Sequence, residues 1–220
     1  MKIAIDGPAG AGKSTISKRA AAELGFIYID TGAMYRAVAL FMLRQGIDTK
    51  NDEKGIEALL SRVDIDICHV DGEQRVFLCG EDVSDKIRTP EVSVGASNVA
   101  VFPAVRTKLT ELQRGLANKY NVIMDGRDIG TCVLPDAEVK IFLTASVDAR
   151  AQRRLLELTE KGIESNFEDV KRDMEYRDKN DSERKCAPLR AAEDSTTVDT
   201  TNYNLEESIE LVLEQIRKRM

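Results

Sequence analysis

Short apolar runs alternate with longer segments of helical periodicity along most of the chain. Five runs of four to six residues read as buried parallel strands, and they cover residues 2–6, 26–30, 122–125, 139–144 and 197–201. Helical patterns cover residues 14–24, 35–45 and 205–219, and the first two stop at a glycine. Strands that alternate with helices predict an α/β fold, a five-stranded parallel sheet with helices on both faces.

One stretch departs from this alternation. Residues 65–70 and 74–79 have strand character and are joined at Asp71-Gly72, a dipeptide typical of a type I′ turn. This pattern predicts a small antiparallel sheet that is separate from the central one. Two helical segments follow it, over residues 90–102 and 103–119.

A segment of mixed charge, residues 148–185, has the pattern of two solvated helices broken near Gly162. The second of them is expected to begin with a capping box, in which Ser165 is the N-cap and Glu168 lies three residues later.

Composition narrows the functional classes. The 220 residues are 42% hydrophobic and carry a net charge of −6, which does not favour nucleic-acid binding, because that affinity comes from neutralising phosphates. The cysteines form no CxxC or Cys/His pattern, so we expect buried, reduced thiols, with a contact of Cys68 and Cys79 across the hairpin as the alternative. The first residues enter a strand without a signal segment, and no apolar run is long enough to span a membrane. We therefore expect a cytoplasmic protein with no membrane partner.

The strongest chemical signal is Gly-Pro-Ala-Gly-Ala-Gly-Lys-Ser at residues 7–14, which matches GxxxxGK[ST] between a strand and a helix. Glycines let backbone N–H groups converge on phosphate oxygens, and the helix N-terminus adds partial positive charge. Lys13 is expected to be exposed and to reach the β- and γ-phosphates, and Ser14 to ligate Mg²⁺. The expected ATP-binding residues of this loop are Gly7, Pro8, Ala9, Gly10, Ala11, Gly12, Lys13, Ser14 and Thr15.

Charged residues follow two further strands. Thr31 and Arg36 come after one strand, and Arg127 and Asp128 after another, whose last residue, Asp125, is a candidate Mg²⁺ ligand through water. In open α/β sheets ligands bind beyond the carboxyl ends of the strands, so these residues are expected near the phosphate loop.

At these residues the chain resembles bacterial cytidylate kinases. The matching stretches are IDGPAGAGKST, IDTGAMYR, GEDVSDKIRTPEV, FPAVR, DGRDIGT, and residues 177–184 with the following APL. The resemblance implies one monomeric kinase domain: a P-loop core of residues 1–60 and 100–220, an NMP-binding insert of about residues 61–99, and a short helical lid of about residues 150–165. Arg150, Arg153 and Arg154 of this lid could close over the phosphates, with a solvated helix face as the equal alternative for any one of them.

The resemblance also implies roles for the acceptor-side residues. The residues that would hold the acceptor's phosphate are Arg36, Arg127 and Arg184. Those that would contact cytosine are Thr31, Arg106 and Asp128, with Arg184 nearby. Those that would contact the pentose are Ser97, Arg177 and Asp181. Thr31 departs from the Ser found in some members but keeps the hydroxyl. Lys13, Arg127 and Arg184 would then be the catalytic residues.

The implied reaction moves the γ-phosphate of ATP to CMP or dCMP, with Mg²⁺. Near neutral pH the acceptor phosphate is already mostly a dianion, so no general base is required and His69 is expected to be structural or solvated. Two alternatives stay open: a P-loop kinase for UMP, dTMP, a sugar or a shikimate-like metabolite, and a non-catalytic nucleotide-binding regulator. A GTPase is disfavoured because residues 118–121 lack the last Asp of an NKxD motif.

Overall fold

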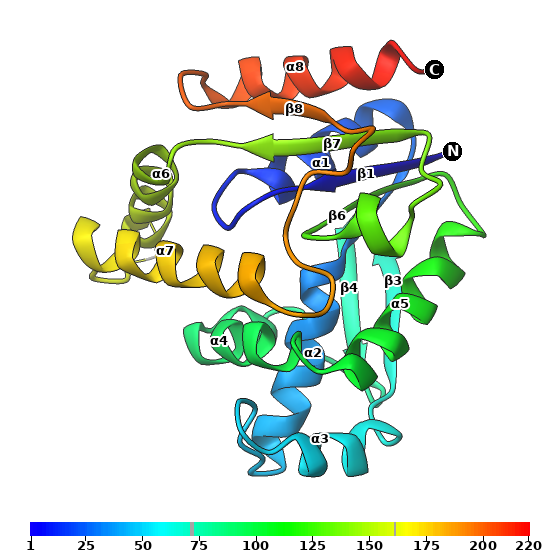
Figure 1. Ribbon diagram of the computed structural model, residues 1–220, viewed down its shortest axis with the longest axis vertical. Helices are drawn as coiled ribbons and strands as arrows, with labels where there is room; N and C mark the ends of the chain where they lie inside the picture. Colours follow the sequence, from blue (N-terminus) through cyan, green and yellow to red (C-terminus); the bar gives the residue numbers. More distant parts are fainter. Residues whose placement is uncertain (71–72, 161) are drawn as a thin grey trace. The chain divides into compact units, whose positions relative to one another are not determined.

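The computed structural model describes residues 1–70, 73–160 and 162–220. The chain forms two compact units, one made of Met1–Tyr28 and Asn121–Met220 and the other of Ile29–Tyr120 (Figure 1). The five-stranded sheet belongs mainly to the first unit and the small antiparallel sheet to the second.

The central sheet confirms the expected α/β class. Its strands run in the order β2-β6-β1-β7-β8, and β1, β6, β7 and β8 pair in parallel. Their bounds are Lys2–Asp6 for β1, Ile27–Asp30 for β2, Val122–Gly126 for β6, Val139–Thr144 for β7 and Thr196–Asp199 for β8. Asp6 pairs with Gly126 in this register, so β1 and β6 end at the same level.

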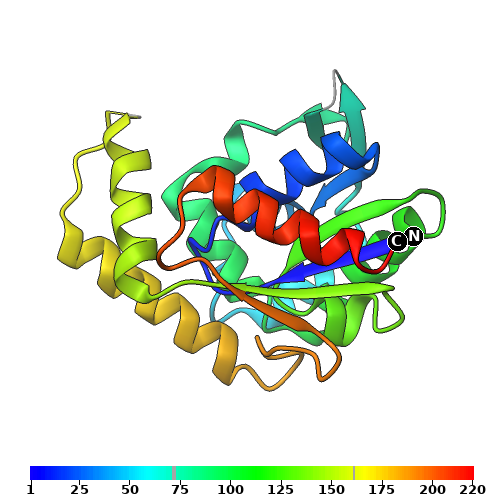
Figure 2. The same ribbon diagram turned by 90° about the horizontal axis from the view of Figure 1, so that it is seen from above.

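Two helices pack on this sheet within the first unit. Helix α1 (Lys13–Leu24) contacts β6 and α8 (Leu205–Arg217), and α8 also contacts β7 and β8 (Figure 2). Buried isoleucines and valines of these strands and helices form the main core cluster of the unit. Burial of this apolar surface stabilises the central strand β1, from whose carboxyl end the phosphate loop emerges.

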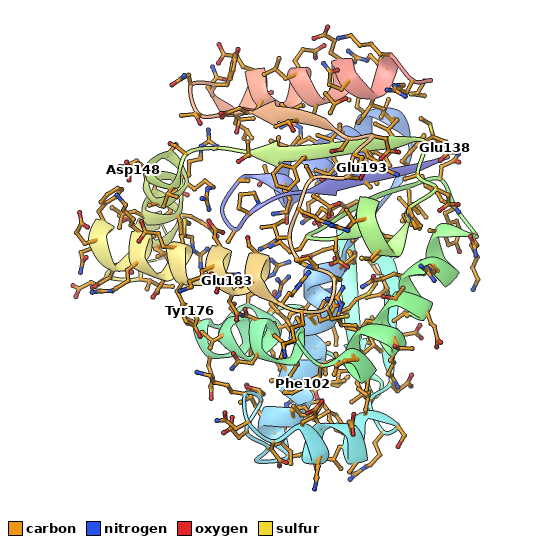
Figure 3. All side chains as sticks on the ribbon, viewed as in Figure 1. Phe102, Glu138, Asp148, Tyr176, Glu183 and Glu193 are labelled. Atoms are coloured by element: carbon orange, nitrogen blue, oxygen red, sulfur yellow. The ribbon has the colours of Figure 1, made fainter. Side chains whose placement is uncertain are left out.

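The segment of mixed charge forms two helices, α6 (Val147–Glu160) and α7 (Phe167–Glu183). They pack on one another through a small cluster of their own that contains Ala151, Val170 and Met174. Lys171 of α7 also pairs with Asp148 of α6 at 2.7 Å (Asp148 is labelled in Figure 3). The N-cap of α7 is Asn166, which accepts from the Asp169 N–H, so the expected cap at Ser165 is wrong by one residue.

The second unit contains the separate antiparallel sheet, in the order β3-β4-β5, as expected. Cys68 pairs with Arg75 rather than facing Cys79, and all four cysteines are free thiols. The expectation that they are buried is wrong, because three are half-buried and Cys79, just after the end of β4, is exposed. The Asp71-Gly72 turn lies outside the described residues. The bounds in this unit are α2 Thr31–Arg44, α3 Glu53–Leu60, β3 Ile65–Val70, β4 Glu73–Leu78, β5 Glu81–Asp82, η1 Lys86–Arg88, α4 Pro90–Val99 and α5 Pro103–Ala117.

The insert expected over residues 61–99 falls within this second unit. No helix in the described parts of the chain is both long and apolar enough to cross a lipid bilayer.

Candidate functional site

The phosphate loop leaves β1 through glycines that no other residue could replace without strain. Gly7, Gly10 and Gly12 all have positive φ, and Gly12 caps α1 in the left-handed conformation. A Cβ on Gly7 would lie 1.9 Å from the Leu143 carbonyl oxygen of β7. The loop therefore packs against the neighbouring strand, and its N–H groups and the N-terminus of α1 form an anion-binding site.

Lys13 is the first residue of α1 and is buried, not exposed as expected from the sequence. Its Nζ donates to the Pro8 carbonyl oxygen at 2.8 Å, across the loop. Burial, and then the nearby Arg127, lower the pKa of Lys13 to about 7, although Asp125, Asp6 and Asp181 oppose this shift. The charged form of Lys13 is therefore disfavoured in the loop, and an anionic ligand would stabilise it.

Ser14 and Asp125 bring a hydroxyl and a carboxylate together beside the loop. The Ser14 hydroxyl donates to Asp125 Oδ2 at 2.8 Å, and the Tyr28 hydroxyl donates to Asp125 Oδ1 at 3.2 Å. These hard oxygen donors suit Mg²⁺, which is commonly held by one or two protein oxygens together with phosphates. Within the described residues, no cluster of three or more His, Cys, Asp or Glu side chains could hold a metal by itself.

Just after β6, two ion pairs connect the end of the strand to the C-terminal end of α7. The strand end supplies the cation of one pair and the anion of the other. Arg127 Nε donates to Asp181 Oδ2 at 2.8 Å, and Arg184 Nη2 donates to Asp128 Oδ1 at 3.1 Å. Arg184 also donates to the Ala187 carbonyl oxygen at 2.6 Å. Burial acts to raise the pKa of Asp181, but Arg127, Arg184 and Arg177 together lower it below its ordinary value. Two expected phosphate ligands and two expected nucleoside ligands are thus brought together.

Asp6 is a buried carboxylate that sequence reasoning missed. It accepts hydrogen bonds from the Ile129 and Gly130 N–H groups, both at 2.7 Å, and so fixes the π-helical turn η2 (Ile129–Val133) that follows Asp128. Burial raises the pKa of Asp6 to about 6 despite these two bonds. An Asp at the end of an apolar strand run gives no sequence signal for such a distant partner.

The three arginines expected on the lid make different contacts. Arg150 is buried and bonds the Ala9 carbonyl oxygen of the phosphate loop at 2.8 Å. Arg153 donates to the Thr200 hydroxyl and carbonyl oxygens at 3.2 and 2.5 Å, and Arg154 pairs with Glu157 at 2.7 Å. Of the three, only Arg150 is held against the phosphate loop.

In the second unit, Asp30 organises the start of α2. Its carboxylate accepts from the Ala33 N–H at 2.9 Å and from Arg36 Nη2 at 2.8 Å. Burial would raise the pKa of Asp30, but Arg36 and the Ala33 N–H lower it overall. Arg36 Nε is buried without a hydrogen-bond partner among the described residues, and Thr31 is buried in the same turn. This turn therefore carries an oriented guanidinium.

Arg106 of α5 and Ser97 of α4 are the other expected ligands in this unit. Arg106 is buried, lies 5.8 Å from the centroid of the Tyr35 ring, and donates to the Ala100 carbonyl oxygen at 3.4 Å. Ser97 is half-buried. The described contacts hold Arg106 near the start of α2, the helix that also carries Arg36.

The family model and the curated relatives agree on one family. The family model described as cytidylate kinase matches residues 3–218. The cytidylate kinase of Caldicellulosiruptor bescii is 54% identical over 218 residues, covering 99% of this chain and 96% of that protein. The cytidylate kinase of Lactobacillus johnsonii is 52% identical over 219 residues, covering 100% and 95%. A solved structure of an uncharacterized protein from Eubacterium ventriosum shares the fold, with a TM-score of 0.57, 12% identity, and coverage of 100% of this chain and 99% of that one.

Proposed function

The chain belongs to the cytidylate kinase family, and from this premise we propose that it transfers the γ-phosphate of ATP to CMP or dCMP, giving ADP and CDP or dCDP. The observation that carries the proposal is the parallel pairing of β1 with β6, in which Asp6 lies opposite Gly126. The phosphate loop and the Arg127-Asp128 pair therefore start at the same level of one sheet edge. A phosphate donor and charged acceptor ligands are both available there.

On the donor side, residues 7–15 form the triphosphate site, and Lys13 and backbone N–H groups of the loop bind the phosphates. Pro8 has no N–H, and the Ala9 N–H donates to Asp178, so these two residues contribute shape rather than donors. Lys13 would exchange the Pro8 carbonyl for a phosphate oxygen, a much stronger partner for an ammonium. Arg153 and Arg154 remain proposed ATP ligands, and to reach a phosphate they would have to leave Thr200 and Glu157.

Mg²⁺ would be held by the Ser14 hydroxyl and, through water, by Asp125. The fit rests on the convergence of these two oxygen groups, and Tyr28 holds the carboxylate from its other oxygen. When bound, the ion neutralises charge on the phosphates.

On the acceptor side, we propose the nine residues Thr31, Arg36, Ser97, Arg106, Arg127, Asp128, Arg177, Asp181 and Arg184 as CMP ligands. The acceptor's phosphate has a second pKa near 6 and attacks as a dianion, so catalysis consists of alignment and charge neutralisation. Lys13, Arg127 and Arg184 supply the positive charge and are the proposed catalytic residues. His69 takes no part, since it is exposed on β3 of the antiparallel sheet.

The test is an acceptor panel. The protein is mixed with ATP, Mg²⁺ and one of CMP, dCMP, UMP, dTMP, shikimate or gluconate, and release of ADP is measured. We expect rapid turnover with CMP or dCMP. Turnover only with another acceptor would show a different kinase, and ATP binding without turnover on any acceptor would show a regulator.

A monomer in the cytoplasm is the setting we propose for this activity. Consumption of ATP and four free thiols both fit a reducing compartment. The proposed partners are the nucleotides themselves, with no nucleic acid and no membrane.

A further inference from the structure

An ion pair outside the proposed ligand set, Arg150 with Asp178, binds both backbone polar groups of Ala9 in the phosphate loop. The Ala9 N–H donates to Asp178 Oδ1 of α7 at 3.3 Å, and Arg150 Nη1 of α6 donates to the Ala9 carbonyl oxygen at 2.8 Å. Arg150 and Asp178 also pair with each other, Nη2 to Oδ2, at 2.7 Å. Both backbone polar groups of Ala9 are therefore bonded to one ion pair.

The contacts of Arg150 show what its guanidinium does. Its third nitrogen, Nε, donates to the Ala145 carbonyl oxygen at 2.9 Å, and its side chain is 4% exposed. All three nitrogens are thus engaged with protein atoms. This pattern is typical of a residue that holds backbone in place, because each guanidinium nitrogen already has a protein partner.

Helix α7 touches the loop at the next residue as well. A Cβ on Gly10 would lie 2.7 Å from Met174 Cε and 3.4 Å from Arg150 Cβ. Met174 belongs to the cluster that packs α6 on α7. The two helices therefore contact the loop as a pair, through polar bonds at Ala9 and apolar packing at Gly10.

We propose that Arg150 and Asp178 are positioning residues for the phosphoryl donor, which act by fixing the backbone of Ala9. A phosphate loop binds anions only when its successive N–H groups converge, and that convergence depends on the φ and ψ angles of each loop residue. With both polar groups of Ala9 fixed before the donor arrives, less conformational freedom is lost on binding. The inference rests on the proposed nucleotide binding by the loop and does not depend on the identity of the acceptor.

The test measures donor affinity without an acceptor. A non-hydrolysable ATP analogue with Mg²⁺ is titrated into wild type, Asp178→Ala and the matched control Asp173→Ala by calorimetry. Asp173 is an exposed carboxylate on the same helix. We expect Asp178→Ala to weaken analogue binding on the order of tenfold, because a charge-assisted bond to the loop is lost. The control should stay within about twofold.

Two further measurements separate positioning from general damage. The affinity of Asp178→Ala for CMP alone, measured by the same titration, should be within about threefold of wild type. The double variant Arg150→Met/Asp178→Ala should lose less affinity for the analogue than the product of the two single-variant losses. Unchanged analogue affinity in Asp178→Ala, or an equal loss for the analogue and CMP together with a lowered melting temperature, would overturn the inference. If Arg150→Met does not fold, Arg150→Lys takes its place in the cycle. Failure of wild type to phosphorylate CMP would overturn the proposed activity and leave this result standing.

Discussion

Replacement of Asp128 by Asn is expected to change which base the enzyme prefers. Asp128 is buried, and its Oδ1 accepts from Arg184 at 3.1 Å. A guanidinium can only donate, so an Asn here would turn its carbonyl oxygen toward Arg184. Its NH₂ group would then stand where the second carboxylate oxygen was, and an acceptor at that position would become a donor.

The size of the effect follows from the groups that are exchanged. Cytosine presents an amino donor where uracil presents a carbonyl acceptor. In the Asp128→Asn enzyme, CMP would lose a bond to a charged acceptor, about 1.5–3 kcal/mol, and UMP would gain a neutral bond of about 0.5–1.5 kcal/mol. The ratio of kcat/KM for CMP over UMP should therefore fall on the order of a hundredfold.

The assay is steady-state kinetics with both nucleotides, on wild type, Asp128→Asn and the exposed control Asp173→Asn. Removing a charge next to buried Arg184 is expected to destabilise the fold by about 3 kcal/mol, less if the Ala187 carbonyl satisfies the guanidinium, so thermal unfolding is followed in parallel. A folded Asp128→Asn enzyme with an unchanged CMP to UMP ratio would refute the assignment of Asp128 to the base.

Three other outcomes are expected. Lys13→Ala should lower kcat about 10²–10³-fold, while His69→Ala should leave it unchanged; the opposite order in a rate assay would contradict the assigned charge chemistry. The pKa of Lys13 is about 7, and bound phosphates should raise it, so ATP binding at pH 8 should take up about 0.9 of a proton. Calorimetry in buffers of different ionisation enthalpy measures this proton uptake, and it should find no uptake in Lys13→Ala. Gly7→Ala should lower the free energy of unfolding by several kcal/mol, since the new Cβ would lie 1.9 Å from the Leu143 carbonyl oxygen. Gly25→Ala should lower it by about 1–2 kcal/mol, because Gly25 has open space around it and only its positive φ opposes a side chain. Equal losses in thermal unfolding would contradict the packing argument.

The apolar pattern predicts the strands of the central sheet well, because buried strands require apolar side chains. The predicted bounds of β1 and β7 match the structure to the residue, since both runs are largely apolar and their apolar side chains are mostly buried. The sequence pattern predicts a start of α2 at residue 35, four residues too late, because Thr31-Gly32 resembles a turn and the cap that the Asp30 carboxylate provides has no apolar signal. The eight-residue α3 and the two-residue β5 were not predicted, because such short elements form through tertiary contacts.

The site was predictable where chemistry is coded locally. The phosphate loop is one continuous motif, and Arg127 and Asp128 stand at a strand end, so sequence and sheet geometry were enough to select them. Their partners are not local: Asp181 lies 54 residues from Arg127. The sequence groups Arg150 with Arg153 and Arg154 because charge along a solvated helix does not show which side chain turns inward. The cause is the fold itself, which brings the start of α6 to the loop.

The first unit is assembled from both ends of the chain, and the second from one continuous segment. In the register of the sheet, Ile3 pairs with Ile123 and Val139, so β1 has neither neighbour until just over half of the chain exists. At about 5–20 residues per second, a ribosome completes Ile3 roughly 6–24 s before Ile123. During synthesis the whole sequence of the second unit is completed before β6 is made. Until then the apolar residues of β1 have no neighbouring strand to pair with. The phosphate loop is thus synthesised before both strands that flank β1, and it acquires its shape only after they have been added.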